Sequence, residues 1–283
     1  MKDAGGRRAR WWAALRRTPV AVWNDDVTDW AAALTYYAVL ALFPVLLVIL
    51  SVLGLTIPTA KPEVIDRITQ AAPLASRALL RGTLRQMTGQ SSAAWALIVL
   101  GGAGALWSGS SYLSVFRRAL HAMHRTSSHR PLWRTAPRII TTALVLILLL
   151  LTSVLALFLT GSLAAFLGRA LNLGTGPQAA WHALRWPLVV AVAVVTVLVL
   201  YHSGPEFSRP VGKMAPGGVL AVALLLVFSL GCTAYTSHVG SYHRLYGSLG
   251  SVVIFLVWLW LSNLALLTGA QFNAELAKTP QEE

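Results

Sequence analysis

The stretch YYAVLALFPVLLVILSVLGL, residues 36–55, decides the fold class of this 283-residue chain. It stays apolar for longer than the core helix of a soluble protein normally does, and it holds a proline, Pro44, near its middle. A helix needs about 20 mostly apolar residues to cross the hydrocarbon core of a bilayer. The segment therefore predicts a membrane-spanning helix, which Pro44 kinks because proline removes a backbone hydrogen-bond donor.

Five more segments of this kind follow. Only 12% of the residues are charged, about half the share of an average globular protein, which is roughly 25%. The charge-free windows are residues 30–57, 91–116, 139–168, 186–205, 214–243 and 245–274. We therefore expect an all-α polytopic membrane protein with six transmembrane helices plus short amphipathic interfacial helices. The predicted spans are about 30–57, 91–116, 139–168, 186–205, 214–238 and 246–275.

These spans divide the chain into three predicted parts. Residues 1–29 form a basic N-terminal segment, residues 30–276 the transmembrane domain, and residues 277–283 a short tail. The first apolar run is too long for a cleaved signal peptide, so we expect it to be retained. The N-terminal arginines and tryptophans predict either an interfacial helix or a disordered basic tail. The pattern of apolar residues in the outer loop, residues 58–90, predicts two amphipathic helices at the outer surface, whose arginines meet either anionic headgroups or an acidic partner, or else form a plain solvated face.

The distribution of positively charged residues along the chain predicts how the protein is oriented in the membrane. The formal net charge is +13. With the N-terminus in the cytoplasm, 15 of the 23 Lys and Arg residues fall on the cytoplasmic side and 8 on the outer side. Cytoplasmic segments of membrane proteins are enriched in these residues. Both termini are therefore predicted to be cytoplasmic, and no nucleic-acid partner is needed to explain the charge.

Small residues predict close helix packing in two places. Gly101, Gly104 and Ser108 lie in the second span, and Gly247 and Gly250 lie near the start of the last one. Small side chains allow helix backbones to approach closely in a membrane. The hydroxyl groups in the second span allow a sharper alternative, which is a substrate path lined by serines.

Polar and aromatic residues within the spans are the candidate functional positions. Tyr36 and Tyr37 precede the Pro44 kink, which is either a bend beside a cavity or a purely architectural feature. The last span gains polar side chains near its end. A carboxylate at the membrane boundary is a functional candidate, although an interfacial acid at a helix end is the plainer interpretation. These late polar residues are Asn263, Gln271, Asn273 and Glu275.

The basic connection at residues 117–138 predicts an anionic ligand. Arg117, Arg118 and Arg138 flank the spans and are candidates for binding lipid headgroups, each contributing about 1 kcal/mol near an anionic surface. His121 and His124 share a helix face, but no acid or cysteine is close enough in sequence to complete a zinc site. We expect no metal and no cofactor. The single cysteine, Cys232, excludes an internal disulfide.

Three stretches resemble the YihY/BrkB family of bacterial membrane proteins, over about residues 20–278. The first resembles the family's first-helix signature at Ala31 to Ala33, Tyr36, Tyr37, Phe43, Pro44 and Gly54. The segment PGGVLAVALLLVFSLGCTAY with SYHRLYGSLG is similar to the middle of the family. The closing signature matches at Tyr246, Gly247, Leu249, Gly250, Trp258, Leu261, Ser262, Gly269, Asn273, Ala274, Glu275 and Leu276. The family often has Glu where Gln271 stands in this chain.

The resemblance implies a multi-pass protein of the bacterial plasma membrane with six helices and no settled molecular activity. Some members have been linked to export of lipid A or other envelope components, and an old ribonuclease BN label is regarded as misassigned. We therefore expect transport or flipping of an anionic, lipid-like envelope component, with membrane lipids as partners. The alternative is a scaffold protein of the cell envelope; a homo-oligomer or an envelope partner stays open.

An enzymatic function is not expected. Hydrolysis of RNA needs positioned acid and base groups, or metals held by His and Asp clusters. The metal-hydrolase pattern HxHxDH is absent from the sequence. The connections between the predicted spans are also too short to form a soluble catalytic domain. Ribonuclease activity is therefore not expected for this chain.

Overall fold

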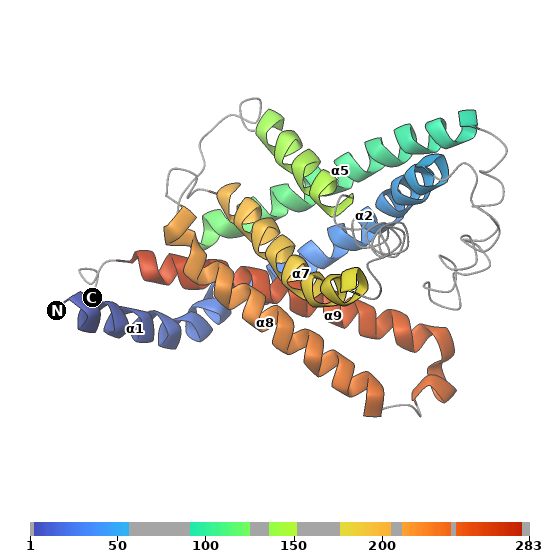
Figure 1. The fold of residues 1–283 in the computed structure, drawn as a ribbon. Coiled ribbons are helices and arrows are strands. Elements are labelled where there is room, and N and C mark those ends of the chain that lie inside the picture. The colour runs from blue at the N-terminus through green and yellow to red at the C-terminus, as the bar shows by residue number, and fades with distance from the viewer. Residues whose placement is uncertain are drawn as a thin grey trace.

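The computed structural model describes residues 3–56, 91–124, 136–151, 176–204, 211–238 and 242–278 of the chain. Within these ranges the secondary structure is helical and contains no strand, which confirms the predicted all-α class for this part of the chain. The helices, labelled as in Figure 1, are α1 (Asp3–Asn24), α2 (Val27–Thr56), α5 (Ser91–Met123), α7 (Gly176–His202), α8 (Val211–His238) and α9 (Tyr242–Ala277). A shorter helix, Ala136–Leu151, carries no label.

Four of the described helices are long and apolar enough to cross a membrane. The candidate spans are Val27–Ile49, Trp95–Met123, Met214–Thr236 and Gly250–Ala277. Two further predicted spans overlap the shorter apolar helices Ala136–Leu151 and Val190–His202. A total of six spans and the cytoplasmic position of both termini stay predictions. The predicted outer loop 58–90 lies outside the described residues.

The helices extend beyond the charge-free windows that predicted them. α5 continues past residue 116 to Met123, so Arg117 and Arg118 lie on a helix and not in a connection. α8 begins at Val211, before the predicted start of its span at residue 214, so Pro216 lies inside the helix. Backbone hydrogen bonding continues a helix without apolar side chains, so the windows predict where helices lie but not where they end.

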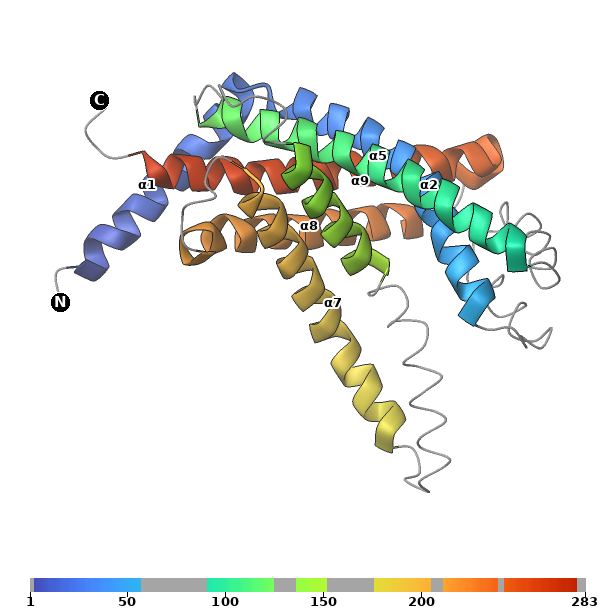
Figure 2. The ribbon, with the colours of Figure 1, turned by 90° about the horizontal axis from the view of Figure 1, so that it is seen from above.

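Helix α9 lies at the centre of the described structure. It packs along α8 and also contacts α1, α2 and α5, while α2 and α5 form the other closely packed pair. Figures 1 and 2 show α1 beside the end of α9 at Ala277. Figure 2 shows α7 leaning away from the other helices towards its Gly176 end. A single helix thus connects most of the bundle.

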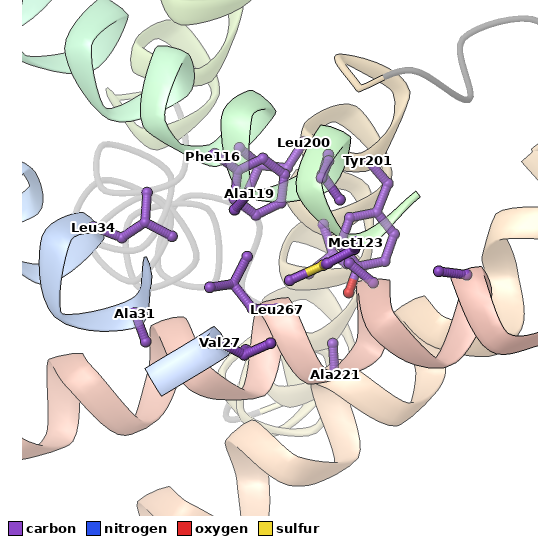
Figure 3. Packing of buried hydrophobic residues seen from close by; sticks show 14 of the residues in the cluster. Val27, Ala31, Leu34, Phe116, Ala119, Met123, Leu200, Tyr201, Ala221 and Leu267 are labelled. Carbon is purple, nitrogen blue, oxygen red and sulfur yellow. The ribbon is translucent and has the colours of Figure 1, made fainter. Parts of the chain in front are cut away.

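The hydrophobic core gathers at one end of the bundle. It forms where the start of α2, the ends of α5, α7 and α9, and the start of α8 meet (Figure 3). Its fully buried members include Val27, Ala31, Leu34, Leu113, Phe116, Ala119, Ala221 and Leu267. Lipid tails are as apolar as leucine, so close packing and hydrogen bonds hold membrane helices together more than removal from water does.

Candidate functional site

The late polar residues of α9 point into the bundle. Asn263, Gln271, Asn273 and Glu275 are all at least 94% buried. Burying a polar group without a hydrogen-bond partner costs free energy, and the cost is large where no water is present. Each of these side chains is therefore expected to have a partner, and the partners show what each residue does.

Asn263 links three helices. The hydroxyl of Tyr112 on α5 donates a hydrogen bond to Asn263 Oδ1 at 2.8 Å. Asn263 Nδ2 in turn donates to Thr35 Oγ1 on α2 at 3.1 Å, and that hydroxyl donates to the carbonyl of Ala31 at 2.8 Å. The predicted candidate Asn263 thus acts as an interhelical tie in this structure, with Tyr112 and Thr35 as partners that the sequence analysis did not single out.

Replacing Tyr112 with phenylalanine is expected to lower the free energy of unfolding by about 1 kcal/mol, because Asn263 Oδ1 loses its donor inside the bundle. Reversible unfolding in mixed detergent micelles measures the change. Tyr36→Phe is the matched control, since Tyr36 is 61% exposed. Equal effects of the two substitutions would show that the Tyr112 hydrogen bond contributes nothing.

Asn273 ties α9 to α8 at a close helix crossing. Its Oδ1 accepts a hydrogen bond from the backbone N–H of Gly217 at 2.8 Å, and its Nδ2 donates to the carbonyl of Met214 at 3.0 Å. A methyl group built on Gly217 would lie 2.1 Å from the carbonyl oxygen of Gly269, and one on Gly269 would lie 2.3 Å from that of Gly217. The two backbones therefore touch, and only glycine fits on either side.

A tyrosine from α7 completes this crossing. The hydroxyl of Tyr201 donates to the carbonyl of Leu266 on α9 at 2.6 Å. The Tyr201 ring stacks on Phe116, and Phe116 stacks on Tyr112, with ring centroids 6.3 and 6.5 Å apart. A buried aromatic row therefore joins the Asn263 tie to the Gly217–Gly269 crossing.

Gln271 ties α9 to the junction between α1 and α2. Its Nε2 donates a hydrogen bond to Asp25 Oδ2 at 2.7 Å. Gln271 Oε1 is buried without a hydrogen-bond partner among the described residues. The next residue after Asp25, Asp26, has a positive φ of 49°, a left-handed conformation that Asp tolerates better than most residues. Glu275 pairs with Lys278 on its own helix end.

The predicted packing glycines of α5 lie against the proline of α2. A methyl group on Gly101 would lie 3.1 Å from the Pro44 carbonyl oxygen, and one on Gly104 would lie 3.2 Å from the Pro44 ring. Ser108 is 8% exposed. Pro44 thus sits in a helix–helix contact between α2 and α5. Gly250 lines a groove between α8 and α9, and Gly247 lies in the first turns of α9.

A groove with hydroxyl groups lies between α5 and the helix Ala136–Leu151. We call it the hydroxyl groove. Its volume is about 640 Å³, within the range of small-molecule sites. Apolar and aromatic side chains form most of its wall, and polar groups enter from α5 and α2. The residues that line it include Tyr37, Trp107, Ser110, Ser111, Ser114, Arg118, Ile139 and Ile140.

The three predicted headgroup-binding arginines lie in different surroundings. Arg118 is exposed and lines the hydroxyl groove. Arg138 Nη2 donates to the carbonyl of His202 at 3.3 Å, which places a cation at the C-terminal end of α7, where the helix dipole favours it. Arg117 is half-buried. Of the two tyrosines predicted to be functional, Tyr37 lines the hydroxyl groove. Its neighbour in the sequence, Tyr36, is exposed.

A larger groove of about 710 Å³ lies between the later part of α8 and the earlier part of α9. Its wall is almost entirely apolar and includes Cys232 and Tyr235. Among the described residues that line it, none carries a charge, so this part of the wall gives no orientation to an anionic ligand. We therefore take the smaller hydroxyl groove, which combines apolar surface with hydroxyl groups and a cation, as the candidate functional site.

Two histidines at the C-terminal end of α5 hydrogen-bond to carbonyls of the preceding turn. His121 Nδ1 hydrogen-bonds the carbonyl of Arg117 at 2.7 Å, and His124 Nδ1 that of Leu120 at 2.8 Å. Among the residues that the structure describes, no group of three or more His, Cys, Asp or Glu side chains is arranged to hold a metal ion.

Sequence reasoning missed the partners of the ties. Tyr112 and Tyr201 carry no local signal that distinguishes them from packing residues. One pattern pointed to the crossing: Pro216 lies inside α8 and is followed by two glycines, opposite an asparagine at the end of α9. A proline-glycine pair within one apolar segment, together with an asparagine in another apolar segment, is the sequence signal that would have found this crossing.

Known proteins resemble this chain over most of its length. The family described as Virulence factor BrkB matches residues 19–283. The putative ribonuclease-like protein YfkH of Bacillus subtilis is 25% identical over 252 residues, covering 88% of this chain and 89% of YfkH. A UPF0761 membrane protein of Alkalilimnicola ehrlichii is 28% identical over 267 residues, and one of Xanthomonas oryzae is 27% identical over 263 residues.

The matched lengths differ between these relatives. The alignments cover 90% of this chain in both UPF0761 proteins, but only 56% and 58% of those proteins. The chain therefore spans a little over half the length of the UPF0761 relatives and nearly all of YfkH. No solved structure matches the chain.

Proposed function

The chain belongs to the Virulence factor BrkB family of bacterial membrane proteins, and from that premise we propose that it binds an anionic, lipid-like envelope component in the hydroxyl groove and moves it across the membrane. The observation that carries the proposal is the groove itself. An amphipathic ligand needs apolar surface for its chains and polar groups with a cation for its head. The hydroxyl groove supplies both on neighbouring turns of α5.

The serines of the groove supply hydrogen-bonding capacity at membrane depth. Ser111 Oγ donates to the carbonyl of Trp107 at 2.9 Å, and Ser114 Oγ donates to that of Ser110 at 2.8 Å. These bonds satisfy the hydroxyl protons within the helix, so the wall is stable without a ligand. Each oxygen keeps acceptor capacity, and each hydroxyl is able to rotate towards a ligand oxygen.

Arg118 gives the groove its charge preference. It lies on α5 after the serines, close to the C-terminal end of the candidate span Trp95–Met123. An arginine there attracts an anionic headgroup, and its planar guanidinium binds phosphate through two parallel hydrogen bonds. The apolar walls, which include Trp107 and Ile139, would then hold the acyl portion of the same molecule.

The test is a lipid-flipping assay with purified protein in vesicles of phosphatidylcholine and phosphatidylglycerol, using NBD-labelled phosphatidylglycerol as the probe. Wild-type protein is expected to flip the probe faster than protein-free vesicles do. Arg118→Gln is expected to slow flipping about fivefold, corresponding to the loss of about 1 kcal/mol of headgroup attraction. Arg118→Lys keeps the charge and is expected to retain most of the activity.

A second pair of variants tests the groove wall. Ser111→Leu places an apolar side chain in the groove and is expected to slow flipping. Gly102→Leu is the control on the same helix, because a Cβ atom added at Gly102 would have no neighbouring atom within 4 Å. Equal flipping by wild-type protein and protein-free vesicles would overturn the transport proposal. Binding of the probe without flipping would favour the scaffold alternative.

A further inference from the structure

Helix α1 has one face packed on the bundle. Ala14 and Thr18 are 3% exposed, and the Thr18 hydroxyl donates to the Ala14 carbonyl at 2.8 Å within the helix. Trp11 makes an edge-on contact with Phe272 of α9, with ring centroids 5.8 Å apart. Just after the C-terminal end of α1, Asp25 accepts the hydrogen bond from Gln271. Helix α1 is therefore attached to α9 near its middle and at its C-terminal junction with α2.

The opposite face of α1 exposes large apolar side chains. Trp12 is 65% exposed, Leu15 44%, Val20 62% and Trp23 79%. With 3.6 residues per turn these four side chains lie along one side of the helix, away from Ala14 and Thr18. We call this surface the aromatic face of α1. Two exposed tryptophans on one helix face form an apolar patch that needs a partner.

Arginines accompany the aromatic face. Arg16 lies between Leu15 and Val20 in the sequence and on the same side of the helix, and Arg10 and Arg17 follow one edge of it. All three side chains are exposed. The face therefore combines apolar rings with positive charge. A surface that fits it has an apolar layer for the rings and negative groups at its border with water for the arginines.

We propose that the aromatic face of α1 docks on the anionic headgroup layer of the membrane, with its tryptophans at headgroup depth and its arginines on lipid phosphates. Tryptophan rings concentrate at this depth, and arginine stems lie along apolar surface while their guanidinium groups reach the headgroups. Basic amphipathic helices with tryptophan on the apolar face bind anionic bilayers in this way.

The chain itself brings this face to a membrane. Helix α2 begins at Val27, directly after the junction at Asp25 and Asp26, and its segment Val27–Ile49 is a candidate span. The C-terminal end of α1 thus lies at the boundary of a bilayer that contains α2. The docked helix would hold the Phe272 end of α9 at the same leaflet, through the Trp11 and Asp25 contacts.

The experiment measures the depth of α1 in the full chain. A nitroxide label is attached at Val20→Cys in a Cys232→Ser background, which removes the native thiol. The protein is placed in nanodiscs of phosphatidylcholine alone or of phosphatidylcholine with phosphatidylglycerol, in which about one lipid in three is anionic. The label is expected to be shielded from a water-soluble nickel relaxant in the anionic discs and less so in the neutral discs.

Charge variants separate docking from folding. Arg10→Gln together with Arg16→Gln is expected to lower the ratio of docked to undocked α1 about 25-fold, about fivefold for each arginine. A label at Val227→Cys, a side chain 61% exposed on α8, is the hydrocarbon reference and is expected not to change. High salt is expected to weaken docking as it screens the arginines.

Equal access of the relaxant to the Val20 label in both kinds of disc would overturn the choice of an anionic surface. Full access in both would overturn docking altogether. An unchanged label depth in the double variant would show that the arginines contribute nothing. None of these results depends on lipid flipping, so the proposal stands or falls independently of the proposed function.

Discussion

Replacing Gly217 or Gly269 with alanine is expected to destabilise the protein by about 3 kcal/mol or more. The added methyl group would lie 2.1 Å from the Gly269 carbonyl oxygen in one case and 2.3 Å from that of Gly217 in the other. Backbone atoms cannot move aside as a flexible side chain does, so α8 and α9 must separate. Overpacking of this kind typically costs 1–3 kcal/mol and sometimes more. Reversible unfolding in mixed micelles measures the loss.

Gly231 provides the matched control on the same helix. A methyl group there meets nothing within 4 Å, and alanine has a higher helix propensity than glycine by about 1 kcal/mol. Gly231→Ala is therefore expected to leave stability unchanged or to raise it. If Gly217→Ala prevents folding altogether, its recovery as a monodisperse protein, compared with that of Gly231→Ala, reports the same difference. Equal stability of the two variants would contradict the close crossing.

Replacing Asn273 with alanine is expected to lower the free energy of unfolding by about 2 kcal/mol. The substitution removes the acceptor of the Gly217 N–H and the donor to the Met214 carbonyl. A buried donor without an acceptor costs about 1–3 kcal/mol.

Ser262→Ala is the control for the Asn273 substitution. Ser262 is also buried on α9, but its hydroxyl donates only to the carbonyl of Trp258 on the same helix, at 2.7 Å. Its loss is expected to change stability by less than about 0.5 kcal/mol, because no interhelical bond is broken. A larger effect at Ser262 than at Asn273 would show that the α8–α9 tie is not what holds the crossing together.

The sequence predicts the fold class because membrane spans need long apolar segments, and such segments are visible without any knowledge of contacts. The all-helical class and the four candidate spans follow from this. The helix ends do not, as the extension of α5 to Met123 and of α8 back to Val211 shows. Helical hydrogen bonds continue through polar residues, so composition marks the membrane part of a helix and not its full length.

The candidate residues of α9 were identifiable because a polar side chain in an apolar helix is conspicuous. Their partners were not, because Gly217 contributes a backbone N–H and Tyr112 lies far away in the sequence. The contact with Asp25 explains why a glutamine fits at position 271, where the family that the sequence resembles often has Glu. An amide donates a hydrogen bond to that carboxylate, whereas a second carboxylate would repel it unless one of the two were protonated.

The central position of α9 has a consequence for how the protein is made. α9 is synthesised after every other helix that the structure describes, yet Asn263, Gln271 and Asn273 hold those earlier helices together. Until the ribosome has released α9, Tyr112, Asp25 and the Gly217 amide have no partner from it. The closely packed pair of α2 and α5 is able to form before α9 is made, whereas the attachment of α1 and α8 to that pair through α9 is completed only when α9 enters the bilayer.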